Sequence, residues 1–361
     1  MTDNEIIVIN GHSEPFIPSG VKSVYISSHG NIKGLILPEG VKDIHFNRTT
    51  GIEKLTLPSS LTYLSLNKIQ KTENLKLNDG LETLELNSVA RIKKLDLPNS
   101  LKELHLDSLK STNNLILPEG LEELHLNSVK KLNNFVLPSS LKCLYLNSLE
   151  SIRGISLPEG LEELSLNSVS NIDSLVVPPN IRILILKGVI SLKNVKFPNT
   201  LKELDLENVV DVNNVVLPKK MDLLMLDSLE DLKGIVLPEE VKYLSLNGLK
   251  NSKGIVLPKT IDYLYMNGLT SLSGFKFPEM KDGARVSFDG VRYVENFTFP
   301  EELGWLSLKN AKVIKNVKFT TALIHLNIPK LEYYENTDFP FILFDDLDLP
   351  KCDGANETIR K

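Results

Sequence analysis

Cysteine is scarce in this sequence: 361 residues contain only Cys143 and Cys352. The two lie far apart and form no CxxC pair, which argues against a disulfide framework or a zinc cluster. Residues 1–5 are acidic, and residues 6–9 are the only apolar run that follows, whereas a secretory signal needs a positive start and a longer apolar core. We therefore expect a protein that is cytoplasmic, or secreted by a route without a cleavable signal peptide.

The sequence also lacks a long apolar run and a strong charge of one sign. No stretch approaches the roughly 20 apolar residues that span a bilayer, so we expect no transmembrane segment. Lys and Arg number 41 against 46 Asp and Glu, for a net charge of -5. A chain with this balance has no broad basic field, and nucleic acid is not an expected partner.

The dominant feature of the sequence is a repeat of twenty residues, which must be recognised before domains are counted. Proline occupies the same position in most repeats, and Asn78 replaces it in one. The repeat after Pro278 has two extra residues, and Pro300, Thr320 and Pro340 keep the shifted phase. The in-phase prolines before the shift are Pro18, Pro38, Pro58, Pro98, Pro118, Pro138, Pro158, Pro178, Pro198, Pro218, Pro238, Pro258 and Pro278.

Apolar residues recur at fixed places within each repeat and predict its local structure. Residues 124–126 and 135–137 alternate with a period of two, as strands do, and no window keeps the 3.6-residue period of a helix. One coil cannot bury its own leucines, but stacked coils form a continuous core. The apolar places of one unit are Leu117, Leu121, Leu124, Leu126, Val129, Leu132 and Phe135.

This pattern predicts an all-β or mostly β repeat solenoid of about sixteen coils, with parallel strands stacked between coils. Residues 1–17 lack the repeat phase and are expected to cap the solenoid. The solenoid itself is expected over residues 18–350, with an irregular unit at 279–300. Residues 351–361 are expected to form a polar tail.

The repeat resembles that of leucine-rich repeat proteins. Leu121-x-x-Leu124-x-Leu126 resembles the strand motif LxxLxL, and the twenty-residue LPxxLxxLxL run is similar to bacterial effector or BspA-like repeats. This resemblance covers roughly residues 18–350 and implies a repeat architecture more than a biological role. One departure is that the usual motif places Asn two residues past the last strand leucine, where this chain has Val129; its asparagine, Asn127, comes directly after the strand.

That departure leaves two interpretations open. Either the asparagine ladder of the motif has moved, or the turn differs. The solenoid is accordingly expected to be a horseshoe or a straighter two-sheet β-solenoid.

A search for chemistry finds one cluster of interest. His105 and His125 share a column in adjacent coils, and Glu85 shares it one coil earlier, which would make a weak surface metal site. The other interpretation is a tolerated polar pair, and it is the one we adopt. The sequence contains no GxSxG, HExxH or P-loop motif. Cys143 and Cys352 are interpreted as an outward-facing surface thiol and a tail residue. We expect no enzyme, metal or cofactor.

The outward positions of the first strand change character along the chain. They are mainly polar in the first half, for example Glu123 and His125, and large and apolar in the second half, where Trp305 is the only tryptophan. Exposed apolar patches usually mark interaction sites, and Trp and Tyr are enriched in binding hot spots. The residues of this predicted patch, named here the stripe, are Ile183, Ile185, Leu223, Met225, Tyr243, Tyr263, Tyr265 and Trp305.

Competing interpretations of the stripe are also open. Residues 279–285 could fold over it and turn it into a local second core, or its aromatics could reflect only the preference of aromatic residues for strands. A further outward column, on the second predicted strand, raises self-association as an alternative. That column contains Ile116, Val136, Val176, Val216, Val236 and Val256.

These observations predict a non-catalytic protein–protein interaction scaffold, either an effector or an adaptor. The alternative is a glycan- or surface-binding module, in which Tyr263 and Trp305 would stack on sugars.

Overall fold

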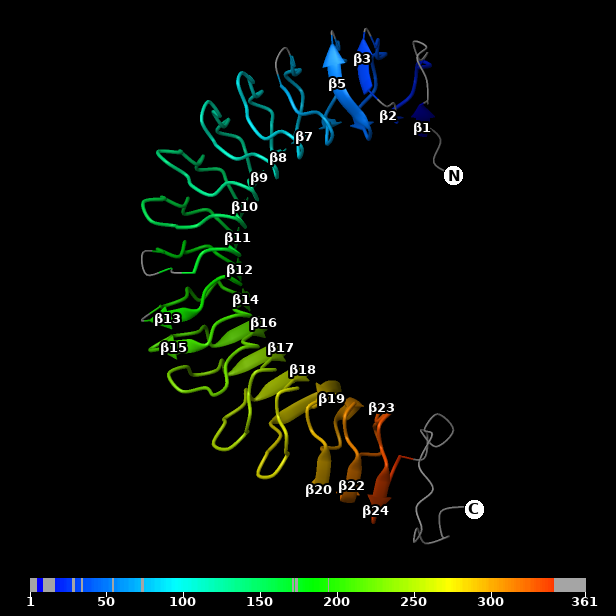
Figure 1. Cartoon of the computed structure of the whole chain (residues 1–361), viewed down its shortest axis with the longest axis vertical. Coiled ribbons are helices and arrows are strands. Elements are labelled where there is room, and N and C mark those ends of the chain that lie inside the picture. The colour runs from blue at the N-terminus through cyan, green and yellow to red at the C-terminus, as the bar shows by residue number, and fades with distance from the viewer. Residues whose placement is uncertain are drawn as a thin grey trace. The chain divides into compact units, whose positions relative to one another are not determined.

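The structure, a computed structural model, describes residues 5–8, 17–27, 30–33, 35–53, 55–72, 75–170, 172, 175–193 and 195–340. These residues form a parallel β-solenoid without a helix (Figure 1). It follows that none of them forms a helix able to cross a membrane. The chain divides into unit 1, Met1–Arg182, and unit 2, Ile183–Lys361.

Unit 1 is built on one parallel sheet, named here the main sheet of that unit. From β2 onward each strand pairs with the next in a register of twenty residues, as with Leu124 beside Leu144, whereas β1 pairs with β2 at a spacing of eighteen. The strand β1 (Glu5–Val8) extends this sheet beside β2, where the sequence predicted a cap. The other strands are β2 (Ser23–Ile26), β4 (Asp43–Phe46), β6 (Tyr63–Ser65), β7 (Thr83–Glu85), β8 (Glu103–His105), β9 (Glu123–His125), β10 (Cys143–Tyr145) and β11 (Glu163–Ser165).

Unit 2 has a main sheet of the same kind. The irregular unit of the sequence forms the strand β19 of this sheet. The register of β19 shifts against β18 between Ile261 and Tyr263, and it shifts against β21 between Ala284 and Arg285. Bulges of this kind insert residues without ending a sheet. The strands are β12 (Ile183–Ile185), β14 (Glu203–Asp205), β16 (Lys220–Met225), β17 (Glu240–Ser245), β18 (Thr260–Tyr265), β19 (Glu279–Ser287), β21 (Leu303–Ser307) and β23 (His325–Asn327).

The second strand predicted for each coil is largely wrong. Residues 135–137 form no strand, and Ile155 N–H instead donates to the carbonyl of Ile152 within its own coil. Within each unit the coils fan apart on the side opposite the main sheet, which separates backbones that would have to pair there (Figure 1). Short pairs do occur on this side: β3 (Gly30–Lys33) with β5 (Thr49–Glu53), β13 (Ser191–Lys193) with β15 (Asp211–Asn213), and β20 (Tyr293–Thr298) with β22 (Val313–Lys318) and β24 (Tyr333–Glu335).

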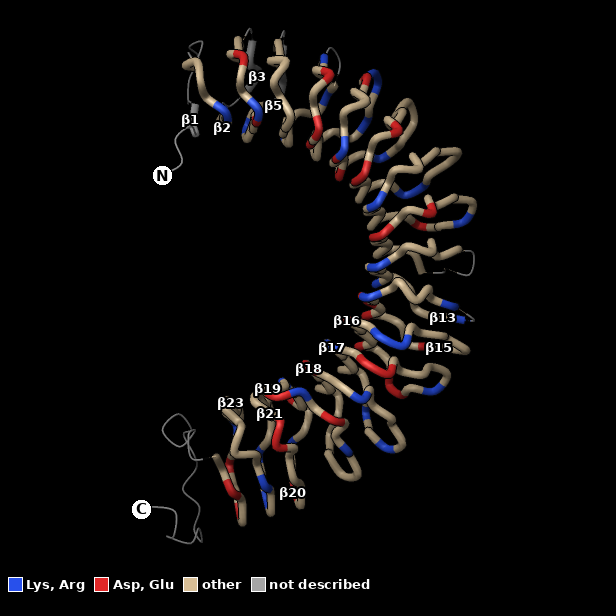
Figure 2. Tube along the Cα trace, turned by 180° about the vertical axis from the view of Figure 1, so that it is seen from behind, with Lys and Arg blue, Asp and Glu red and all other residues tan. Residues whose placement is uncertain are grey.

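Charged residues of both signs are interspersed along the coils of each unit (Figure 2). Many form ion pairs between neighbouring coils, such as Lys142 with Glu122 at 2.6 Å in unit 1 and Lys242 with Asp222 at 2.6 Å in unit 2. The charged groups of these pairs are largely exposed and screened by solvent, so each pair adds little to stability. Their main consequence is a surface on which the signs alternate.

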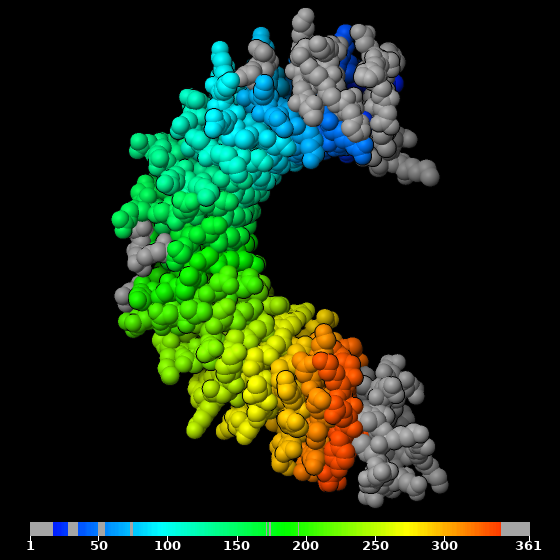
Figure 3. Space-filling view, viewed as in Figure 1, coloured from blue at the N-terminus to red at the C-terminus, as the bar shows by residue number. Residues whose placement is uncertain are grey.

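The core runs between the main sheet and the turns that follow it. Leu121, Leu124 and Leu126 have no exposed surface, and the same columns are fully buried in neighbouring coils. Packing is looser towards the opposite side, where Phe135 is half-buried. In the space-filling view successive coils of each unit lie directly against one another (Figure 3). The leucine columns are therefore the interior of a stack, as the repeat predicted.

The asparagine ladder is present and has moved to the position directly after the strand. The side-chain oxygen of Asn87 accepts from the backbone N–H of Asp107 at 3.2 Å. In unit 2 the side-chain oxygen of Asn247 accepts from the backbone N–H of Asn267 at 3.0 Å. Asp takes the role in some coils, because either side chain offers an acceptor. Of the two interpretations of the departure in the motif, a moved ladder and a different turn, the structure therefore supports the moved ladder.

Left-handed backbone marks the far turn of many coils. Asn134 has φ of 52° and Gly154 has φ of 76° at the same place in adjacent repeats. Glycine and asparagine are the residues that adopt this conformation most readily. The predicted polar tail, residues 351–361, and Cys352 lie outside the described residues.

Candidate functional site

The face of the main sheet that points away from the core presents two rows of side chains. The first and third positions of each three-residue strand point outward, since side chains alternate along a strand. The twenty-residue register stacks like positions, so Tyr243 lies beside Tyr263 and Glu123 lies beside Cys143. We name the row that contains Glu123 and Tyr243 the first row, and the row that contains His125 and Tyr265 the second row.

In unit 2 the structure places every stripe residue on these two rows, and each is half-buried. Ile183, Leu223, Tyr243, Tyr263 and Trp305 occupy the first row. The remaining members occupy the second row: Ile185, Met225 and Tyr265.

The stripe is not continuous. Glu203 and Asp205 lie between the isoleucines and the next apolar pair, and Lys187 forms an ion pair with Asp205 at 3.3 Å. Sequence reasoning omitted these charged members of the same columns. The group beyond them, from Leu223 to Tyr265, is therefore the largest part of the stripe without a charged residue; Ser245 stands in its second row between Met225 and Tyr265.

Residues 279–285 do not fold over the stripe. They belong to β19, which continues the sheet, and Arg285 stands in the first row between Tyr263 and Trp305. The stripe is thus interrupted in its own plane by the guanidinium group of Arg285 rather than covered by a loop.

The tyrosines of the stripe pack against one another. The ring centroids of Tyr243 and Tyr265 are 5.1 Å apart, and those of Tyr243 and Tyr263 are 5.9 Å apart. The guanidinium carbon of Arg285 lies 5.6 Å from the ring centroid of Tyr263. Burial and the nearby Tyr265 raise the pKa of Tyr243, so its hydroxyl is a neutral donor at physiological pH. Trp305 stacks separately on His325, with centroids 5.2 Å apart.

The same two rows are polar in unit 1 and form a hydrogen-bonded network. Tyr63 Oη donates to Glu85 Oε1 at 2.6 Å, and Asn67 Nδ2 donates to Glu85 Oε2 at 2.6 Å. Burial alone would raise the pKa of Glu85, but these hydrogen bonds outweigh it and lower that pKa. Burial and the bond to Glu85 raise the pKa of Tyr63. Glu85 is therefore a carboxylate held in place.

Unit 1 also has aromatic stacks that sequence reasoning missed. Tyr25 stacks on His45 with centroids 4.5 Å apart, and His45 lies 4.7 Å from Tyr63. The signal was available in the sequence, because Tyr25, Tyr63 and Tyr145 stand in the same outward columns that revealed the stripe. Aromatic content therefore does not by itself distinguish the two units. The difference lies in what surrounds the rings, which is carboxylates in unit 1 and aliphatic side chains in unit 2.

A second stack in unit 1 brings three metal-ligating side chains together. His105 and His125 have ring centroids 4.0 Å apart, and Tyr145 stacks on His125 at 4.1 Å. His125 Nε2 lies 2.7 Å from Glu123 Oε1. One ligand atom from each of His105, Glu123 and His125 lies within 4.8 Å of the other two. The third member is thus Glu123, whereas the sequence suggested Glu85; Glu123 was missed because it stands in the neighbouring column.

Two pKa shifts in unit 1 bear on its chemistry. Burial and the neighbouring His125 lower the pKa of His105, which favours the neutral imidazole. Burial and the carboxylates of Glu163 and Glu123 raise the pKa of Cys143 to about 11. A thiol with that pKa is a weak nucleophile at neutral pH, because the thiolate is the reactive form.

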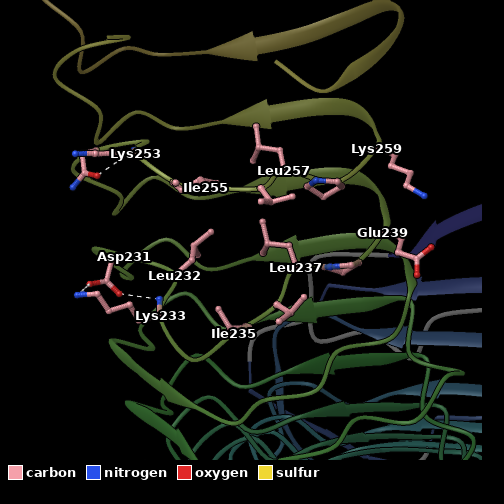
Figure 4. Close-up of a pocket in the computed structure, with 16 residues that line it drawn as sticks. Asp231, Leu232, Lys233, Ile235, Leu237, Glu239, Lys253, Ile255, Leu257 and Lys259 are labelled. Atoms are coloured by element: carbon pink, nitrogen blue, oxygen red, sulfur yellow. Dashed lines mark hydrogen bonds and ion pairs between the residues drawn. The ribbon is translucent and has the colours of Figure 1, made fainter. Parts of the chain in front are cut away.

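On the side opposite the main sheet, the exposed apolar column is where the sequence placed it. Its exposed fractions exceed one half throughout, for example 83% for Ile116 and 84% for Val256. In unit 2 a groove of about 740 Å³ opens between two successive coils there, lined in part by Ile235, Val236, Ile255 and Val256 (Figure 4).

Charged residues border this groove without converging in it. Asp231 Oδ2 forms an ion pair with Lys233 at 3.1 Å and lies on the outer turn of its coil (Figure 4). The groove contains no stripe residue. It is a gap between fanning coils rather than a site with directed chemistry.

The repeat and the fold are similar to those of known proteins. The family described as BspA type leucine rich repeat region matches residues 21–122 and 87–184, with 6 copies. No curated protein matches the sequence. YopM from Yersinia enterocolitica WA-314 is 15% identical, with a TM-score of 0.46 over 94% of this chain and 84% of that chain. CroV588, described as a novel circular LRR protein, is 19% identical, with a TM-score of 0.43 over 87% of this chain and 60% of that chain, so this chain spans less than two thirds of its length.

The family match and the described coils agree on the nature of the repeat. The matched residues contain the buried columns of Leu84, Leu104 and Leu124 and the asparagine ladder that follows their strands. Residues 21–184 therefore match leucine-rich repeats of the BspA type, and the described coils that follow continue the same twenty-residue register.

Proposed function

We propose that this protein is a non-catalytic protein-binding scaffold and that the stripe on unit 2 contacts the partner. The observation that carries the proposal is the group from Leu223 to Tyr265, where large apolar side chains stand half-exposed on a rigid sheet. Burial of tyrosine and leucine against a partner would supply the hydrophobic core of an interface.

The surroundings of the stripe favour a protein partner. Arg285, Glu203 and Asp205 stand between its apolar members and together supply charges of both signs. Charges at the rim of an apolar patch orient a partner and set its specificity. The rows are formed by strands fixed to the core, so little conformational entropy is lost when they bind.

Sugar binding is less well supported by the same contacts. A sugar stacks on a free aromatic face, but the faces of Tyr243 and Tyr265 are directed at each other, and Arg285 lies over Tyr263. The ring edges and hydroxyls are what remain for a ligand. This arrangement suits the mixed apolar and polar surface of a protein better than the face of a pyranose.

The absence of catalysis is also a proposal, and it rests on the chemistry of the described residues. Cys143 has a pKa of about 11. The carboxyl of Glu85 is engaged by two hydrogen bonds. The protein is proposed to act in the cytoplasm, or to be secreted without a cleavable signal and act as an effector. The cellular compartment of the partner would distinguish a cytoplasmic protein from a secreted effector.

Affinity capture with quantitative mass spectrometry tests the scaffold proposal. The baits are the wild-type chain, a Tyr243→Ala/Tyr265→Ala variant and a matched Tyr63→Ala/Tyr145→Ala variant that removes two tyrosines from unit 1. Lysates of the source cell and of a host cell are used in parallel. Circular dichroism and a melting curve establish that each bait is folded.

The expected result is a protein captured by the wild type and by the unit 1 variant but not by the unit 2 variant. Two hot-spot tyrosines each contribute at least about 2 kcal/mol, so loss of either weakens binding about 30-fold. Equal capture by all three baits would show that the stripe is the wrong surface. Failure of every bait to capture a protein, together with glycan-array binding that Tyr263→Ala abolishes, would replace the proposal with sugar recognition.

A further inference from the structure

We propose that His105, Glu123 and His125 form a binding site for a divalent first-row transition metal of the zinc class on unit 1. Their ligand atoms lie within 4.8 Å of one another on the outward face of β8 and β9. Imidazole nitrogen and carboxylate oxygen are ligands that Zn²⁺ accepts, and a His₂Glu set is known to hold it. The site is separate from the stripe and does not depend on the proposed protein binding.

The fold brings these residues together by two independent regularities. The twenty-residue register pairs His105 with His125 across adjacent strands, which stacks their rings. The alternation along β9 places Glu123 and His125 on the same face, and they already contact each other at 2.7 Å. Three ligands from two adjacent strands need no rearrangement of the backbone.

Small side-chain movements complete the geometry. Bonds of about 2.0–2.1 Å in a tetrahedral site put ligand atoms about 3.3 Å apart, so the widest pair has to close by up to about 1.5 Å. The three side chains are half-buried on an open face, where the movement falls mainly to His105 and Glu123, because Tyr145 stacks on His125. Metal binding displaces the proton that lies between His125 Nε2 and Glu123 Oε1 into solvent, and this 2.7 Å contact opens to about 3.3 Å. A water molecule supplies the fourth ligand, as in sites that keep one open position.

The surroundings are suited to a cation. Glu85, Glu123 and Asp107 all exert a negative electrostatic influence on His105. Tyr145 stacks on the far face of the His125 ring and limits its rotation. Asn127 Nδ2 donates to Asp107 Oδ1 at 2.6 Å, which holds one of these carboxylates in place. Partners of this kind orient metal ligands and strengthen binding.

Isothermal titration of the full chain with ZnCl₂, after dialysis against a chelator, tests the site. The variants are His105→Ala, His125→Ala and Glu123→Gln. His45→Ala is the matched control, because His45 stands in the same row and stacks on Tyr25 without joining the cluster. Cys143→Ser removes the neighbouring thiol of the first row. Co²⁺ absorption reports the coordination number independently, and a melting curve without metal establishes that each variant folds.

The proposal expects one equivalent of Zn²⁺ and an intense visible Co²⁺ band typical of four ligands. Loss of either histidine should weaken binding more than about 100-fold, beyond the 10- to 100-fold effect of partners outside the ligand set. Glu123→Gln should weaken it less, and His45→Ala and Cys143→Ser should leave it unchanged. No binding by the wild type would overturn the proposal. Equal binding by a folded His105→Ala/His125→Ala variant, or loss of binding with Cys143→Ser, would also overturn it.

Discussion

Unit 1 and unit 2 share an interior and differ on their outward faces. Leu164 in unit 1 and Leu244 in unit 2 are both fully buried at the same place in the repeat. One position away, the outward neighbours are Glu163 and Tyr243. The repeat therefore fixes the columns that hold the stack together and leaves the intervening columns free to vary.

This difference separates two kinds of side-chain chemistry in one architecture. In unit 1 the outward rings are surrounded by carboxylates, with Tyr63 bonded to Glu85. In unit 2 they are surrounded by aliphatic groups and by other rings, with Tyr243 against Tyr265. The same coil can thus present a polar face in one unit and a more apolar face in the other.

The largest expected effect tests whether the two interiors are equivalent. Leu164→Ala and Leu244→Ala should each lower the free energy of unfolding by ~2–5 kcal/mol, because each leaves a cavity in a closely packed stack. Urea denaturation followed by circular dichroism measures both. The interior would not be shared if one substitution were costly and the other left the transition unchanged.

The next prediction tests whether the outward rows of unit 1 have acidic surroundings. Burial and the carboxylates of Glu163 and Glu123 raise the pKa of Cys143 from 9.0 to about 11. At pH 8 the thiolate fraction should be about 100-fold below that of an ordinary thiol. Alkylation by iodoacetamide in a Cys352→Ser background, followed by mass spectrometry from pH 8 to 11, measures it.

Glu163→Gln removes one of the charges that raise this pKa and should speed the alkylation. Lys130→Ala is the control, since it removes a charged residue from the exposed pair with Glu150 in the same unit. A rate at pH 8 equal to that of a free thiol would contradict the buried, acidic surroundings described for unit 1.

A smaller effect is expected from the ladder that both units share. Asn127→Ala removes the acceptor for the Asn147 N–H at 3.4 Å, and Asn247→Ala removes the acceptor for the Asn267 N–H at 3.0 Å. Each leaves a part-buried polar group unpaired, at a cost of about 1–3 kcal/mol. Urea transitions of the two variants should shift by similar amounts. A shift confined to one unit would show that the ladder stabilises only that unit.

The smallest expected effect concerns pH and unit 1. Burial lowers the pKa of His45 from 6.5, against the opposing charges of Glu85 and Asp43. The unfolded chain then binds a proton at His45 more readily than the folded chain does. The free energy of unfolding is therefore at its full value above pH 6.5 and declines as the pH falls below it. His45→Gln should flatten the dependence of the urea midpoint between pH 7 and pH 5. An unchanged slope would show that His45 is not desolvated.

Much of the fold could be predicted from the sequence because the core columns repeat. Leu121, Leu124 and Leu126 are buried where the period placed them, and the exposure of Val256 also followed from it. The absence of the second strand could not be predicted, because residues 135–137 alternate like a strand although the coils separate on that side. Alternation reports which side a residue faces and not how far away the neighbouring coil lies.

The candidate surfaces were predictable to a lesser degree. The stripe residues share outward columns and are half-exposed, as their spacing indicated. Sequence reasoning missed the partnership of Glu123 with His125, since it compared positions within one column only. It also left out Glu203 and Asp205, which interrupt the stripe. Contacts between columns depend on side-chain rotation, which the period of a repeat does not determine.

Hydroxyl-radical footprinting of the complex with a captured partner is the most direct test of the difference between the two outward faces. Oxidation of each aromatic side chain is compared between the free protein and the complex by mass spectrometry. The account predicts protection of Tyr243, Tyr263 and Tyr265 and unchanged oxidation of Tyr25, Tyr63 and Tyr145. Protection of the unit 1 tyrosines with none at Tyr243 and Tyr265 would contradict it.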